Sequence, residues 1–341
     1  MQLNQHINGD GKWPAAGNAR QRGVAKRILV AYDGSAGADA AITNLGRAGL
    51  PAELEVLVLS VAEQARPEVV GRFARETRPA QQAVSRAEES LSHQLAQQAC
   101  SRLRSLFPRW KVKPAAMIGS PAWGIVGWVA EWEADLVVTG AHGKSCCEGM
   151  LLGSVARRVL ADAPCSIRIA RLCQRPAESS LRIMVAVDGS SADDAVIESV
   201  SGRAWTATTE FQVVTVVDAR LDAVRVSNGS FAAAWKHQHG VEADARACRL
   251  LEKCRNKLRA AGLCVDTLIF EGDLVSRLAQ QAKAWEADCV FLGMPQTGYR
   301  RGSILNRTAL VAAACAPCSV EVVRRSAGAG DYTFKPRQPI K

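Results

Sequence analysis

The sequence predicts an α/β protein built from two similar doubly wound domains, each with an open five-stranded parallel sheet. One stretch of sequence occurs twice, and in both copies short apolar runs alternate with longer helical stretches. Apolar runs without polar alternation are typical of strands buried on both faces of a parallel sheet. Helices between parallel strands imply right-handed crossovers and helices on both faces of the sheet, as in Rossmann-like folds.

The repeat is visible at three places along the chain. Residues 28–42 match residues 183–197 at an offset of 155, with nine of fifteen positions identical. At an offset of 153, Glu133 to Gly140 matches Glu286 to Gly293, and Ala163-Pro-Cys-Ser166 matches Ala316-Pro-Cys-Ser319. These matches predict two domains at 27–171 and 181–325, joined by a linker at 172–180, with tails at 1–26 and 326–341.

Each expected element of the first copy follows from its local pattern. Apolar runs predict strands at 28–32, 55–61, 115–118, 136–139 and 166–170. Helical periodicity predicts a long amphipathic helix at 79–107 and shorter helices at 121–133 and 154–160. The second copy repeats this order.

Composition and charge exclude several classes of protein. The chain has 341 residues, of which 48% are apolar and 22% charged, as in ordinary globular proteins. No run of about 18 apolar residues indicates a membrane span, and no export signal opens the chain, so we expect a cytoplasmic protein with reduced cysteines. The net charge of +10 is not gathered into a Lys/Arg-rich run, so nucleic-acid binding is not expected.

Two loops of the first copy follow the carboxyl ends of predicted strands, where doubly wound sheets bind ligands. Asp33-Gly34-Ser35 is either a capped turn into a helix or part of a binding site. Gly140-Ala-His-Gly143 is followed, after nine residues, by Gly153-Ser154-Val155 at a helix start. Glycines let backbone N–H groups approach an anion closely, and a helix N-terminus adds a favourable dipole. The second loop therefore predicts phosphate binding.

Two common nucleotide motifs do not fit the sequence. Gly143-Lys144-Ser145 resembles the end of a Walker A loop, but Val138 stands where that motif needs a glycine. No G-x-G-x-x-G fingerprint follows the first strand.

Other chemically suggestive residues favour structural interpretations. These are a histidine pair, a C-x-x-C pair before the last strand, and a tryptophan stripe on one helix: His237 and His239, Cys315 and Cys318, Trp123, Trp128 and Trp132. Cys146 and Cys147 lie in the phosphate loop, and an oxidation sensor there remains a hypothesis.

The spacing Gly140-x2-Gly143-x9-Gly153-Ser154 resembles the nucleotide-binding signature of the universal stress proteins. Leu151 to Ala156, followed by Ala163-Pro-Cys, also matches the family pattern, and the resemblance covers both copies. It implies a fold of the adenine nucleotide alpha hydrolase type and ATP as the ligand. It also implies a regulatory or protective role under stress, with little or no catalytic chemistry.

The resemblance assigns roles to particular residues. Asp33 would contact the nucleotide and is the candidate ligand for Mg²⁺. The other assigned residues line the adenine (Ala31, Val61), the ribose (Thr139, Gly140) and the phosphates (His142, Gly143, Gly153, Ser154, Val155). No residue is assigned a catalytic role. The alternative is an adenylating or slowly ATP-hydrolysing enzyme, although Gly34 to Asp39 lacks the Ser-Gly-Gly-x-Asp-Ser type of loop.

The second copy departs from the motif. Gln296 replaces Gly143, Asn306 replaces Gly153 and Arg307 replaces Ser154, so we expect it to bind ATP weakly or not at all. In this family the last strands commonly pair between protomers. We expect the two copies to pair within one chain as a pseudo-dimer, which makes a homodimer optional.

Overall fold

The computed structural model describes residues 26–63, 78–142, 152–172, 175–176, 178–217, 231–294 and 304–324. The chain divides into two compact units. Unit 1 comprises Met1–Gly46, Pro51–Ile167 and Ser326–Lys341, and unit 2 comprises Arg47–Leu50 and Arg168–Arg325. The division thus follows the repeat, except that two short segments of the first copy belong to unit 2.

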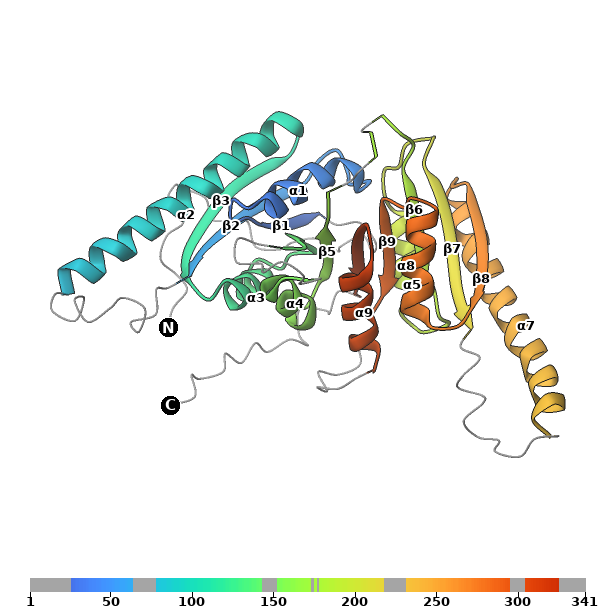
Figure 1. Ribbon diagram of the computed structural model, residues 1–341. Coiled ribbons are helices and arrows are strands. Elements are labelled where there is room, and N and C mark those ends of the chain that lie inside the picture. Colours follow the sequence, from blue (N-terminus) through green and yellow to red (C-terminus); the bar gives the residue numbers. More distant parts are fainter. Residues whose placement is uncertain are drawn as a thin grey trace. The chain divides into compact units, whose positions relative to one another are not determined.

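The first repeat alternates strands and helices in the predicted order (Figure 1). Its parallel strands lie in the order β3-β2-β1-β4-β5, and α1 and α2 cover one face while α3 and α4 cover the other. The strands are β1 (Arg27–Ala31), β2 (Glu55–Glu63), β3 (Lys111–Gly119), β4 (Leu136–Gly140) and β5 (Ser166–Ala170); the helices are α1 (Ala36–Asn44), α2 (Arg78–Leu106), α3 (Pro121–Glu131) and α4 (Ser154–Asp162).

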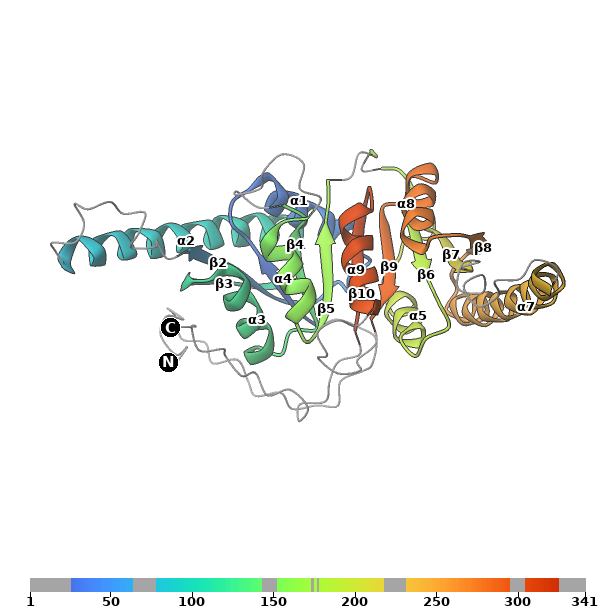
Figure 2. The same cartoon turned by 60° about the horizontal axis from the view of Figure 1, so that its bottom comes forward.

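The second repeat has the same architecture, with parallel strands in the order β10-β9-β6-β7-β8. Helices α5 and α7 lie on one face, and α8 and α9 on the other (Figure 2). The strands are β6 (Arg182–Ala186), β7 (Glu210–Val217), β8 (Val265–Glu271), β9 (Cys289–Gly293) and β10 (Ser319–Val323); the helices are α5 (Asp193–Ser201), α7 (Phe231–Ala260), α8 (Leu274–Ala284) and α9 (Ile304–Cys315).

The apolar runs that predicted the central strands are buried on both faces. Ile28, Leu29 and Val30 of β1 are completely buried, as are Ile183 and Val185 of β6. Removal of such side chains from water is the main source of stability for this kind of sheet. The predicted fold class is confirmed.

Strand β3 begins four residues earlier than the predicted range 115–118. Lys111, Lys113 and Pro114 broke the apolar pattern, yet all three pair with β2. Strand β3 lies at the end of the strand order of its repeat, next to β2 alone. An edge strand tolerates lysine and proline because one side of its backbone has no ladder to complete.

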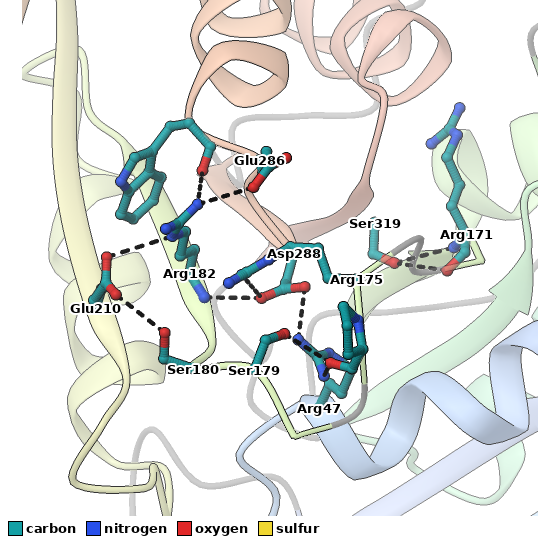
Figure 3. Close-up of polar contacts among 12 residues, drawn as sticks. Arg47, Arg171, Arg175, Ser179, Ser180, Arg182, Glu210, Glu286, Asp288 and Ser319 are labelled. Carbon is teal, nitrogen blue, oxygen red and sulfur yellow. Dashed lines mark hydrogen bonds and ion pairs between the residues drawn. The ribbon is translucent and has the colours of Figure 1, made fainter.

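The repeated Glu-Ala-Asp motif ties the start of the first strand in each repeat. The Asp135 carboxylate accepts hydrogen bonds from the backbone N–H groups of Lys26 and Arg27, both at 2.9 Å. In the second repeat Asp288 accepts one from the N–H of Arg182 at 2.8 Å (Figure 3). The motif is therefore structural, because its carboxylate satisfies strand donors that precede the ladder.

Candidate functional site

The turn after β1 uses two of the predicted site residues to shape its own backbone. Asp33 Oδ1 accepts the Ser35 N–H at 2.9 Å, and Ser35 Oγ caps helix α1 by accepting the Ala38 N–H at 3.1 Å. Gly34 has φ +75°, which suits glycine. The turn is therefore capped as predicted, and the binding role of Asp33 stays a prediction. Asp33 is only half-buried and stands beyond the carboxyl end of β1.

Two glycines allow helix α1 to touch the end of strand β4. A Cβ at Gly140 would lie 2.5 Å from the Gly37 carbonyl atoms, and a Cβ at Gly37 would lie 2.0 Å from the His142 oxygen. Neither position can hold a side chain without moving the backbone. The contact brings the Asp33 turn and the segment after β4 together. Gly37 is therefore a site residue that the sequence analysis did not predict.

The N-terminus of α4 is attached to the same place. The Gly153 N–H donates to the Ala141 oxygen at 2.8 Å. Gly153 is the N-cap of α4 and supplies no side-chain acceptor to the first turn, where Ser154 is exposed and Val155 is half-buried. The first N–H groups of a helix carry partial positive charge and readily donate hydrogen bonds to an anion. Gly143, Cys146 and Cys147 lie outside the described residues.

The remaining predicted residues lie at the carboxyl ends of neighbouring strands. Ala31 is buried at the end of β1, and Val61 is half-buried near the end of β2. Thr139 is buried, and its hydroxyl donates to the Gly140 oxygen at 3.2 Å. Thr139 thus contributes to the backbone of this segment. His142 is half-buried at the last described position before the loop.

A polar cluster beside this turn was not predicted. The Tyr32 hydroxyl donates to Asp39 Oδ1 at 2.9 Å, and Arg102 Nη1 binds the same oxygen at 2.7 Å. Burial, followed by the Asp39 carboxylate, raises the pKa of Tyr32 to about 12. Tyr32 therefore remains a neutral hydrogen-bond donor at physiological pH.

The comparisons with known proteins decide the family. A model of the universal stress protein family matches residues 25–171 and 180–324, which together make up most of the chain. The chain belongs to the universal stress protein family. Each copy of the repeat matches the family model separately, so the tandem architecture is confirmed.

Individual relatives of this universal stress protein are more distant. A universal stress protein of Methanocaldococcus jannaschii, MJ0531, is 36% identical over 77 residues, which are 22% of this chain and 45% of the relative. The chain thus matches about half the length of that curated relative.

Solved structures show the same fold. A universal stress protein from Archaeoglobus fulgidus superposes with a TM-score of 0.62 at 18% identity and covers 88% of this chain and 96% of its own. A functionally unknown protein of Pseudomonas aeruginosa, PA1789, gives 0.54 at 16% identity, with 89% and 93% covered.

The corresponding turn of the second universal stress protein domain is built differently. At the offset of 155, Ala192 stands at the position of Gly37, and α5 begins two residues later than α1 does. A Cβ at Gly293 would lie 2.6 Å from the Ala192 Cβ. The alanine methyl group therefore occupies the space in which, in the first domain, the backbone of Gly37 contacts the backbone of Gly140.

In this turn of the second domain, the carboxylate of Asp193 binds the backbone N–H groups. Its carboxylate accepts the N–H of Gly189 at 2.8 Å and that of Asp188 at 3.4 Å. The first domain has Ala38 at the equivalent position. Gln296 lies outside the described residues, as do the side chains of Asn306 and Arg307, so the predicted loss of ATP binding remains a prediction.

Asp193 should make the stability of unit 2 depend on pH. Burial raises its pKa to about 6, whereas an unfolded chain has about 3.9. Because the folded state holds the proton more tightly, this contribution to stability is full below pH 4 and is lost as pH rises through 6. In Asp193→Asn the amide oxygen still accepts the Gly189 N–H, but nothing ionises. Relative to the wild type, we expect this variant to gain on the order of 2 kcal/mol in urea unfolding between pH 4 and pH 7.5. An unchanged difference across this range would contradict the assignment.

Other predicted candidates have structural environments. Burial raises the pKa of the Cys318 thiol well above its usual range, which leaves little thiolate for redox chemistry with the exposed Cys315. His237 and His239 lie in α7, with side chains outside the described set. Within the described residues no group of three or more His, Cys, Asp or Glu is arranged to hold a metal ion. Among the described helices, none combines the length and apolar character of a membrane span.

Proposed function

We propose that this universal stress protein binds ATP through its first domain and acts as a nucleotide-dependent regulatory or protective module in a cytoplasmic stress response. In this proposal the domains span 27–171 and 181–325, the linker spans 172–180, and the second domain binds ATP weakly or not at all. The two-repeat architecture fits pairing of the domains within one chain.

The observation that carries the proposal is the backbone contact between Gly37 and Gly140. It gathers the Asp33 turn, the end of β4 and, through the Gly153–Ala141 hydrogen bond, the N-terminus of α4. The α4 N-terminus has no side-chain cap and no acidic residue in its first turn, so a phosphate group would supply the missing negative charge.

The proposed roles divide the nucleotide among these elements. Ala31 and Val61, at the ends of β1 and β2, would face the adenine, since apolar strand ends suit a base. The phosphates would lie at Gly153, Ser154 and Val155. Asp33 would supply one carboxylate to Mg²⁺, an ion that is usually held by one or two carboxylates together with substrate phosphates.

Native mass spectrometry of the full chain incubated with ATP tests this proposal. We expect the bound state to carry one ATP. The complex should also form with Mg²⁺ withheld, because the N–H groups of α4 contribute independently of the metal, and should strengthen when the metal is added.

A further inference from the structure

A fully buried charge cluster in unit 2 serves no part of the proposed nucleotide site. Glu321 of β10 has no exposed surface, and Arg168 of β5 is 1% exposed. Arg168 Nη1 lies 2.9 Å from Glu321 Oε2, and Arg203 forms an ion pair with the other carboxylate oxygen. Arg203 also donates to the Ala48 oxygen at 2.6 Å. All four residues belong to unit 2.

The cost of this arrangement argues for a role other than stability. An ion pair removed from water gains little over well-packed apolar side chains, because desolvation cancels most of the attraction. Loss of one member is nevertheless severe, since it leaves a buried charge without its counterion. Buried ionic groups of this kind are best known for fixing which segments come together.

The repeat supplies the decisive comparison. The alignment of Ala163-Pro-Cys-Ser166 with Ala316-Pro-Cys-Ser319 places Arg168 at the position equivalent to Glu321. The two last strands therefore carry opposite charges at the same buried place. Each is complementary to the other, whereas a copy of either strand facing itself would bury two like charges.

Arg171, three residues after Arg168, adds further contacts with the end of the second repeat. The Arg171 N–H donates to Ser319 Oγ at 3.0 Å (Figure 3), and Arg171 Nη2 donates to the Ala313 oxygen at 2.7 Å near the C-terminus of α9. Its repeat equivalent, Arg324, places Nη2 3.0 Å from the sulfur of Met294.

We infer that Arg168 and Glu321 form a charge code for partner choice. The surface around Glu321 accepts the Arg168–Arg171 segment of this tandem chain and rejects a second copy of the β10 segment. A tandem protein with this code completes its assembly from its own two repeats and does not associate through identical last strands.

Charge reversal in the full chain tests the code. Arg168→Glu places two carboxylates together, and we expect its thermal midpoint to fall by roughly 10 °C. Arg168→Met is the matched control, because it leaves the Glu321–Arg203 pair intact, and should lose less than half as much. The double variant R168E/E321R restores two cations and one anion, so it should recover at least half of the loss. A double variant no more stable than the poorer single variant would overturn the inference.

Co-expression keeps the test decisive if the single variants fold poorly. A chain with Arg168→Glu and a differently tagged chain with Glu321→Arg each lack a complementary pair, but together they supply two. Light scattering should show a soluble 1:1 complex with twice the mass of one chain, absent when either chain is expressed alone. Equal self-association of either variant, or no mixed complex, would contradict the code.

Discussion

Replacement of Asp288 by alanine should destabilise unit 2 by about 3–5 kcal/mol, the range expected when a buried counterion is removed. Its side chain is 2% exposed, and its two oxygens pair with Arg47 Nη2 at 2.8 Å and Arg175 Nη1 at 3.0 Å (Figure 3). The same carboxylate accepts the Arg182 N–H. Truncation leaves two largely buried guanidinium groups and one strand donor without this acceptor, and each carries a desolvation cost.

The first repeat offers a matched control for this prediction. Asp135 stands at the equivalent position but is only half-buried, and it accepts two backbone N–H groups at the start of β1. Asp135→Ala should therefore cost less, about 1–2 kcal/mol. Urea unfolding of the full chains, followed by tryptophan fluorescence and circular dichroism, measures both losses. Equal losses in the two variants would show that the arginine pairs of Asp288 contribute nothing.

Gly37→Ala should abolish most of the ATP binding proposed for the first domain. The new methyl would lie 2.0 Å from the His142 oxygen, well inside van der Waals contact, so α1 and the segment after β4 must separate. That separation moves the Asp33 turn away from the α4 N-terminus. If about two charge-assisted hydrogen bonds to the nucleotide are lost, the dissociation constant for ATP should rise roughly 100-fold.

Gly127→Ala is the control for a general effect of methyl groups. A Cβ there meets nothing within 4 Å, and the residue lies inside helix α3. Alanine at a helix interior should stabilise the chain by about 0.5–1 kcal/mol and leave nucleotide affinity unchanged. Titration calorimetry with ATP distinguishes the two variants, and an affinity of Gly37→Ala within threefold of the wild type would refute the assigned geometry.

Much of the fold could be predicted because parallel strands buried on both faces leave a plain apolar signature. Ile28 to Val30 and Ile183 to Val185 show it clearly, and the repeat confirmed each element by a second copy. The start of β3 could not be predicted, because Lys111 and Pro114 are residue types that also occur in loops. An edge strand tolerates both, so the sequence there lacks the apolar pattern of a buried strand.

The candidate site could be predicted only in part. Glycines with motif spacing, such as Gly140 and Gly153, stand out because a ligand constrains several of them together. Gly37 carried no such signal, since its need for a bare Cα arises from a contact with residues more than 100 positions away. Comparison of the repeats could have found it, because Ala192 at the equivalent position accompanies a shifted helix start.

The charge networks of unit 2 were beyond sequence reasoning for a similar reason. Asp288 meets Arg47 across 241 positions and Arg175 across 113. Single arginines along a chain resemble solvated surface residues until the fold brings them to a buried carboxylate.

We propose that one chain holds one nucleotide, in its first domain. Native mass spectrometry of the full chain across an ATP titration tests it most directly, because it counts bound molecules. We expect a single bound ATP at saturation, which is lost in Gly37→Ala and retained in Gly127→Ala and Asp193→Asn. Two ATP molecules of equal affinity, or none, would contradict it.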